Sequence, residues 1–378
     1  MSADVVELLR QLVSIDSVNP SLVPGGAGEA EIARAIAGWA ATAGLEAELI
    51  EGTPGRPSAI VRSRGSGGGR TLLLCGHIDT VGVEGMEAPH SPRVEGGERL
   101  HGRGAYDMKA GVAAALAACA EASSLGLRGD VVVAAVADEE HASLGVREAL
   151  ETLSADGAVV TEPTEMALAT AHKGFVWLEV DVHGRAAHGS RPHLGVDAIV
   201  KSGPILTGIG QLDARLRGRE HPLLGPGSVH ASLIEGGLEL STYPDRCTIG
   251  LERRTLPGET GADAEAELAA LLDRCHAADP ELVADSRTLL VREPFEIDAD
   301  DPFAALVRGA AAGALGAAPA VGGVSYWADS AFIAAAGIPT VLFGPGGEGA
   351  HAVEEWVSVP DTIACARVLT ALAASFCA

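Results

Sequence analysis

The sequence predicts an α/β protein with a mostly parallel sheet flanked by helices and with an inserted α+β domain. Three observations predict this fold. Short, fully apolar runs alternate with helical patterns in the first third of the chain, as in β-α-β units. From about residue 173 the strands instead alternate apolar and polar residues, which is typical of a sheet with one face in water. From about Asp301 the apolar runs return.

The first domain begins with helices and buried strands. Residues 1–14 carry charges at amphipathic helical spacing, and the helical pattern over 29–44 ends at Gly44, a helix C-terminal signal. An Ala-rich run over 109–126 predicts a buried helix. Fully apolar runs predict strands covered on both faces at 71–76, 131–137 and 157–161.

The inserted region has a different pattern. Its predicted elements are the alternating strands 175–184 and 247–259 and a helix over 263–278. The buried style then returns with an Ala-rich helix from about 301, a strand at 338–346 and a final helix from about 361. We therefore expect a discontinuous catalytic domain formed by residues 1–172 and 293–378, around an inserted domain at 173–292.

Composition excludes several classes of protein. With 27 Lys and Arg against 51 Asp and Glu, the net charge of −24 does not suit a nucleic-acid or anionic membrane surface. The longest apolar run, 110–120, is shorter than the ~20 residues of a membrane span, and the N-terminus lacks the pattern of a signal peptide. The six cysteines form no C-x-x-C pair, which favours reduced thiols. We expect a cytoplasmic protein that binds neither nucleic acid nor membranes.

Chemically active side chains follow the buried strands, where α/β sheets gather their ligands. They are His77 and Asp79, then Asp138, Glu139 and Glu140, then Glu162, and finally His351, with Asp107 just before the Ala-rich helix. Imidazole and carboxylate donors favour Zn²⁺, with Co²⁺ or Mn²⁺ as substitutes. Carboxylates that converge without a cation repel one another. Two divalent ions ~3.5–4 Å apart, bridged by a carboxylate and a water, would relieve this repulsion and activate the water as a hydroxide.

Each of these features alone has a simpler interpretation. An H-x-D pair is more often a cap or an ion pair, adjacent glutamates usually form a solvated surface, and a lone histidine before a helix is usually structural. Their joint placement after buried runs favours the metal site, because surface charge has no routine reason to collect there.

Seven ordered segments resemble the dinuclear-zinc peptidase and deacylase family, which includes acetylornithine deacetylase, succinyl-diaminopimelate desuccinylase, aminoacylase and glutamate carboxypeptidase. The segments are GHIDTV (76–81), GRGAYDMKAG (102–111), ADEE (137–140), TEPT (161–164), GRAAHGSRPHLG (184–195), RTLPGE (254–259) and GPG…H (344–351). The resemblance covers nearly the whole chain and implies the same two-domain fold, with the inserted domain acting in dimerisation and as a lid.

The resemblance also implies a role for each site residue. His77 and Glu162 would bind one metal ion, Glu140 and His351 the other, and Asp107 would bridge the two. In the same way, Asp79 would orient His77, Glu139 would be the general base, and the peptide bond between Asp107 and Met108 would be cis.

Two residues of the inserted domain are implied to act on the substrate. His188 matches a catalytic histidine that reaches the partner subunit's active site and helps to stabilise the tetrahedral oxyanion, which implies a homodimer. Arg254 matches an arginine that holds the substrate carboxylate. The residues alone favour a surface ion pair between Arg254 and Glu252 or Glu259. Two segments depart from the family pattern and leave the substrate open: Ser241-Thr242-Tyr243-Pro244 replaces Asn-Val-Ile-Pro, and Gly322–Asp329 is bulkier than the usual glycine-rich stretch.

The expected function is hydrolysis of the amide bond of an N-acyl amino acid by a metal-bridging hydroxide. The alternative within the family is a carboxypeptidase or dipeptidase that acts on short peptides. A metal-stabilised binding protein without turnover would be expected to have a damaged base or ligand set, and this sequence keeps all of them. A nucleotide site at GSGGG (65–69) is excluded because no strand leads from it into a phosphate-binding helix.

Overall fold

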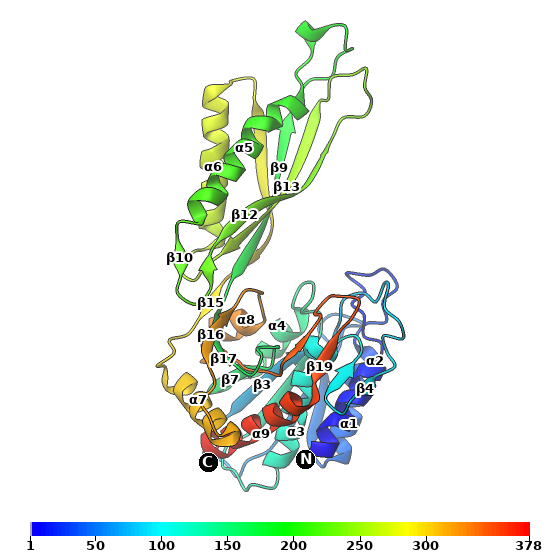
Figure 1. Ribbon diagram of the computed structural model, residues 1–378, viewed down its shortest axis with the longest axis vertical. Helices are drawn as coiled ribbons and strands as arrows, with labels where there is room; N and C mark the ends of the chain where they lie inside the picture. Colours follow the sequence, from blue (N-terminus) through cyan, green and yellow to red (C-terminus); the bar gives the residue numbers. More distant parts are fainter. Residues whose placement is uncertain (1) are drawn as a thin grey trace. The chain divides into compact units, whose positions relative to one another are not determined.

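The computed structural model describes residues 2–378, and the chain divides into two compact units (Figure 1). Unit 1 comprises the described residues up to Thr170, together with Ile297–Gly322 and Ala328–Ala378. Unit 2 comprises Ala171–Glu296 and Gly323–Trp327. The segment 323–327 was expected in the first domain but groups with unit 2, and the expected boundaries at 172 and 293 lie within four residues of those of unit 2.

Unit 1 is built around a sheet whose central strands are parallel. In spatial order these strands are β6 (Val131–Val136), β3 (Leu72–His77), β7 (Gly157–Val160) and β17 (Thr340–Leu342). All of their residues are buried, which explains their continuous apolar sequences. The strands outside them run antiparallel to their neighbours: β1 (Glu46–Ile50), β2 (Ser58–Ser63) and β8 (Leu168–His172). The predicted fold class is confirmed.

Helices cover both faces of this sheet (Figure 1). On one face α3 (Ala110–Ala122) packs against β3, β6 and the C-terminal α9 (Val359–Phe376). The same core includes α1 (Ser2–Ser14), α2 (Ala30–Thr42) and α7 (Pro302–Leu315). The other face carries α4 (Leu144–Leu150) and α8 (Ser330–Ala335).

Small residues let α3 approach the sheet closely at its first turn. A Cβ atom at Gly111 would lie 1.9 Å from the main-chain oxygen of Thr161, so only glycine fits there. Because Glu162 follows Thr161, this contact brings the start of α3 beside the carboxyl end of β7.

Among the described helices, α9 has the length and apolar composition of a membrane-spanning helix. The sequence predicted no membrane span because its longest uninterrupted apolar run is short. That criterion does not detect α9, because Asp361 and Arg367 interrupt its apolar sequence. Half of it is buried, and it packs against α3 and α7 as a core helix does.

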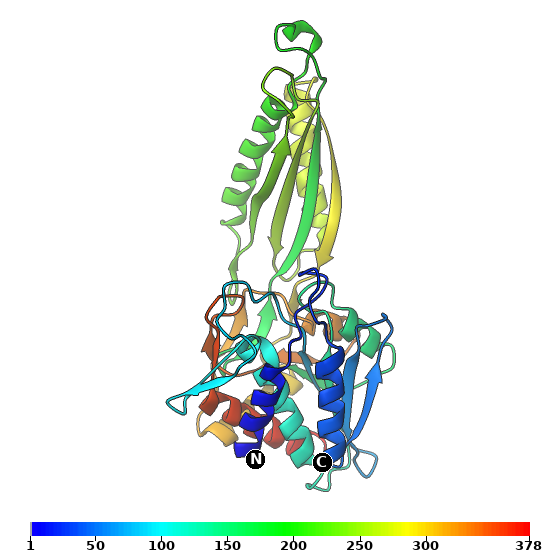
Figure 2. The same ribbon diagram turned by 90° about the vertical axis from the view of Figure 1, so that its right-hand side faces the viewer.

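Unit 2 is an antiparallel four-stranded sheet with both long helices on one face (Figure 2). Its strand order is β12 (Ser228–Gly236), β13 (Arg246–Thr255), β9 (Gly174–His183) and β14 (Val283–Arg292), and its helices are α5 (Ala198–Leu216) and α6 (Gly261–Ala278). Alternate residues of β9, such as Val180 and Val182, are buried in the helix-covered core. This confirms the expected sheet with one face in water.

The remaining elements are short. A small sheet consists of β18 (Gly347–Glu348), β19 (Trp356–Ser358), β5 (Arg99–His101) and β4 (Arg93–Glu95). The others are β10 (Glu220–His221), β11 (Gly225–Pro226), β15 (Phe295–Glu296), β16 (Val321–Val324), the π-helical turn η1 (Ala105–Lys109) and the 3-10 turn η2 (Pro192–Leu194).

Candidate metal centre

Three of the expected ligands lie together at the carboxyl ends of β3 and β7. His77 is the last residue of β3, Glu162 follows β7, and Asp107 lies in η1 just before α3. One potential ligand atom from each lies within 4.8 Å of the other two. The Nε2 atom of His77 is 3.2 Å from the Oδ1 atom of Asp107.

A second group contains Asp107, Glu140 and His351, again with ligand atoms within 4.8 Å of one another. The Nε2 atom of His351 is 3.1 Å from a Glu140 oxygen and 3.3 Å from the Oδ2 atom of Asp107. The two oxygens of Asp107 therefore face different histidines, as a carboxylate shared between two ions would require. The groups His77–Asp107–Glu162 and Asp107–Glu140–His351 form a candidate site for two metal ions.

The turn that carries Asp107 is held by a buried glutamate. The carboxylate of Glu355 accepts hydrogen bonds from the backbone N–H groups of Gly104, Tyr106 and Asp107 at 2.9–3.1 Å. It also accepts one from Arg103 at 2.8 Å. The peptide bond between Asp107 and Met108 is cis, as the resemblance implied.

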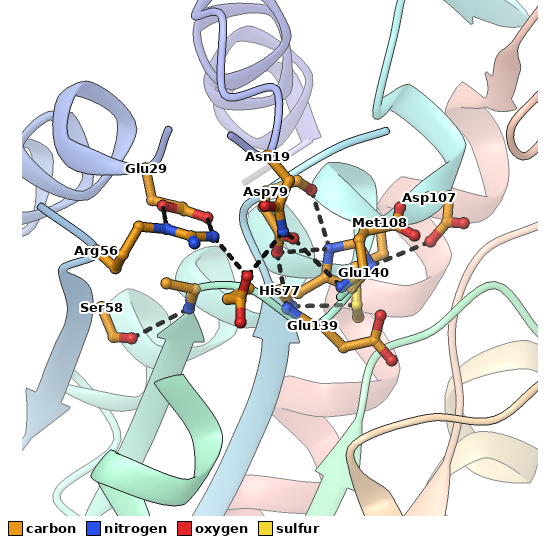
Figure 3. Close-up of polar contacts among 12 residues, drawn as sticks. Asn19, Glu29, Arg56, Ser58, His77, Asp79, Asp107, Met108, Glu139 and Glu140 are labelled. Carbon is orange, nitrogen blue, oxygen red and sulfur yellow. Dashed lines mark hydrogen bonds and ion pairs between the residues drawn. The ribbon is translucent and has the colours of Figure 1, made fainter. Parts of the chain in front are cut away.

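The ring of His77 is oriented by Asp79, but through the main chain. Its Nδ1 atom donates a hydrogen bond to the carbonyl oxygen of Asp79 at 3.0 Å, whereas the nearest carboxylate oxygen is 3.6 Å away. This bond places a proton on Nδ1 and directs Nε2 toward Asp107. The Asp79 carboxylate instead accepts the backbone N–H groups of Glu139 and Glu140, at 3.1 and 3.2 Å (Figure 3).

The electrostatics of the site favour cations. Burial raises the pKa of Glu162 well above its usual range. The charge of His77 opposes this shift, and the charges of Asp107 and Asp329 add to it. Burial likewise raises the pKa of Glu139.

Asp107 and His351 behave differently because they face each other. Burial opposes ionisation of Asp107, but hydrogen bonds from His351 and His77 hold its pKa below the usual range. Bonds to Asp107 and Glu140 raise the pKa of His351 to about 10. Acids and histidines so close retain protons that divalent ions would displace, and the donor set therefore fits two metal ions.

The two expected substrate-binding residues lie in unit 2. The Nε atom of Arg254 donates to Glu252 at 2.7 Å, and its guanidinium lies 5.1 Å from the Phe175 ring centroid. Of the two ion pairs considered from the sequence, the one with Glu252 is therefore present, while Glu259 pairs with Arg253. His188 is exposed, and its Nδ1 atom is 2.8 Å from the Ser190 hydroxyl.

Four buried residues near the metal centre were missed by the sequence interpretation: Asn19, Arg56, Asp329 and Glu355. Asn19 and Arg56 precede the first recognised ligand and lie in loops without periodicity, so no pattern marks them. Asp329 falls within the segment that departs from the family pattern. Glu355 follows His351 but resembles its exposed neighbour Glu354 in sequence.

Comparison with known proteins identifies the family of this chain. Residues 73–375 match the model of peptidase family M20/M25/M40. An acetylornithine deacetylase from Myxococcus xanthus is 31% identical over 83% of this chain and 82% of its own length. One from Proteus mirabilis is 28% identical over 98% of this chain and 96% of its own length. The structure of an M20 family metallo-carboxypeptidase from Sulfolobus solfataricus superposes with a TM-score of 0.79 at 18% identity, over 99% of each chain. This chain therefore belongs to peptidase family M20/M25/M40 and is a hydrolase of that family.

Proposed function

We propose that this protein hydrolyses the amide bond of an N-acyl amino acid and releases a carboxylic acid and a free amino acid. The observation that carries the proposal is the shared Asp107, whose two oxygens face His77 and His351 in adjoining ligand groups. The name acetylornithine deacetylase, given to relatives that match most of this chain, supports the acyl amino acid as substrate.

In this proposal His77 and Glu162 hold one divalent ion, Glu140 and His351 hold the other, and Asp107 contacts both. The imidazole and carboxylate donors suit Zn²⁺ best, with Co²⁺ or Mn²⁺ as substitutes. When bound, the ions supply Lewis acidity toward the substrate carbonyl and lower the pKa of a water molecule.

Glu139 is proposed as the general base. Asp79 is proposed to orient His77, and its carboxylate also accepts the backbone N–H of Glu139. The Glu139 carboxylate accepts a proton as the water oxygen bonds to the carbonyl carbon. It then returns the proton to the amide nitrogen as the carbon–nitrogen bond breaks. The raised pKa of Glu139, caused first by burial, suits a group that must both accept and give up this proton.

Arg254 and His188 are proposed to bind the substrate carboxylate and the developing oxyanion. The Nε atom of Arg254 donates a hydrogen bond to Glu252. Among the described residues, no hydrogen bond involves the two Nη atoms of Arg254, and these atoms can bind the substrate carboxylate. The His188 role requires a second subunit.

We further propose a cytoplasmic homodimer that forms through unit 2. The edge strand β12 is exposed over most of its length, and Leu233 and Ile234 on it are 74% and 56% exposed. Leu238 and Leu240 in the following loop and Val200 of α5 are also exposed. An exposed edge strand with apolar side chains is a natural surface for a second copy.

The test uses metal-stripped protein reloaded with Zn²⁺, Co²⁺ or Mn²⁺ and assayed on N-acetyl amino acids, N-succinyl amino acids and dipeptides in parallel. We expect turnover of acyl amino acids that depends on added metal. The alternative, a carboxypeptidase or dipeptidase, stays open because Ser241-Thr242-Tyr243-Pro244 lacks the amide donor of many relatives. Faster cleavage of dipeptides would favour it. Tight binding of one compound with no turnover of any would indicate a binding protein.

A further inference from the structure

The side chain of Asn19 lies between two buried carboxylates. Its Nδ2 atom donates to Oδ2 of Asp79 at 2.8 Å and to Oδ1 of Asp138 at 3.0 Å. Its Oδ1 atom accepts the backbone N–H of Ser21 at 2.9 Å, which fixes the direction of the amide. Both Nδ2 hydrogens are therefore aimed at acids, and all three side chains are inaccessible to solvent. Figure 3 shows Asn19 beside Asp79.

One of these carboxylates caps the turn that carries Glu139 and Glu140, and the other belongs to the first residue of that turn. Asp79 accepts the backbone N–H groups of Glu139 and Glu140. Asp138 begins the turn with φ at +67°, in the left-handed region that few residues other than glycine adopt. Such a conformation persists only when its surroundings impose it. Because Asn19 donates hydrogen bonds to both acids, it links Asp138, the first residue of the turn, to Asp79, which caps the backbone of the turn.

Asn19 cannot be replaced by the nearby cation. Arg56 donates to Oδ1 of Asp138 at 2.7 Å. It also binds Glu29 through two hydrogen bonds of 2.6 Å (Figure 3). Its charge is therefore divided between Asp138 and Glu29, and no hydrogen bond joins it to Asp79 among the described residues. The side-chain hydrogen bond that Asp79 accepts comes from Asn19. Without Asn19, each of the two buried acids would lose one hydrogen-bond donor.

We propose that Asn19 is a positioning residue for the general base: by bonding Asp79 and Asp138 together, it fixes the turn that directs Glu139 and Glu140 into the metal centre. This inference rests on the proposed function, because it assigns to the turn the roles of base and ligand. Asn19 itself touches neither metal ligands nor substrate.

The experiment compares Asn19→Ala with Thr80→Val. Thr80 is a matched control because it is fully buried next to Asp79, and its hydroxyl has no hydrogen-bond partner in the structure. Each protein is loaded with Co²⁺, and four quantities are measured: kcat and KM on an N-acetyl amino acid, Co²⁺ bound per chain, the visible absorption of bound Co²⁺, and the thermal midpoint.

For Asn19→Ala we expect kcat to fall about tenfold or more with KM within about twofold, as for other residues that orient metal sites. The Co²⁺ absorption should also change, because Glu140 moves with the turn. Thr80→Val should match the wild type in kcat, KM and Co²⁺ absorption. Unchanged kcat and absorption in Asn19→Ala, with only a lower thermal midpoint, would overturn the proposal in favour of a purely structural role.

A second variant covers failure to fold. Asn19→Ser keeps one donor and can serve only one of the two acids, so the same loss of kcat is expected in milder form. If neither variant folds, the contact is structural and the proposal is wrong. If the wild type hydrolyses no substrate, the proposed function fails instead, and the Co²⁺ absorption still reports whether Asn19 shapes the site.

Discussion

Glu355 offers the sharpest test of how the metal centre is held, through the substitution Glu355→Gln. One carboxylate oxygen accepts from the backbone of Tyr106 and Asp107, and the other from Gly104 and Arg103. In glutamine one oxygen becomes an NH₂ group. Whichever way the amide turns, two buried donors lose their acceptor. At ~1–3 kcal/mol for each unsatisfied donor, we expect the free energy of unfolding to fall by about 2–6 kcal/mol.

The substitution Glu355→Gln should also weaken metal binding. The Glu355 carboxylate bonds the backbone of Asp107, whose side chain faces both ligand groups. A displaced turn would move Asp107 out of position in both ligand groups, and we therefore expect the affinity for metal to fall about 10–100-fold.

The assay combines urea unfolding of metal-free protein with a Zn²⁺ titration against a competing chelator. Glu354→Gln is the matched control, because it makes the same change at the adjacent, exposed position. The control should behave as the wild type within about 0.5 kcal/mol. If Glu355→Gln also kept the wild-type unfolding free energy and Zn²⁺ affinity, the reasoning would be refuted.

Four further predictions come from the site and from unit 2. Glu139→Ala should keep its metal content, measured by elemental analysis, and lose about 10²–10⁴-fold in kcat, and normal turnover would exclude Glu139 as the base. Metal affinity should rise with pH up to about 10, because a proton held on His351 by Asp107 and Glu140 must leave before the metal binds. Chelator competition at several pH values measures this affinity, and an affinity independent of pH would contradict the prediction. The raised pKa of His351 also stabilises the metal-free fold. This contribution is fully present below pH 6.5, the ordinary pKa of histidine, and is lost as the pH rises through about 10. Leu233→Glu should yield a folded monomer by light scattering, and a persistent dimer would place the interface elsewhere.

The central strands could be predicted because strands buried on both faces have continuous apolar sequences. Polar residues directly after such runs marked candidate ligands, because their joint placement is unusual for surface charge. The role of each residue came from the family resemblance, and the ligand assignment stays a prediction. The edge strand β12 was missed because most of its residues are exposed, and the apolar–polar contrast that marks a half-buried strand is absent.

The residues that hold the site could not be predicted because their partners are distant in the chain. Asn19 bonds side chains 60 and 119 residues away, and Glu355 bonds backbone about 250 residues away. No local pattern encodes such pairs. The ion pair of Arg254 was foreseeable because Glu252 lies two residues away on the same face of β13.

The single carboxylate of Asp107 makes the two cation positions interdependent. An ion held by the His77–Asp107–Glu162 group would fix one oxygen of that carboxylate and, with it, the oxygen that faces His351. Occupation of one position would therefore change the affinity of the other, and by thermodynamic reciprocity the effect would be equal in both directions. A titration curve fitted with two independent constants would then describe neither position correctly.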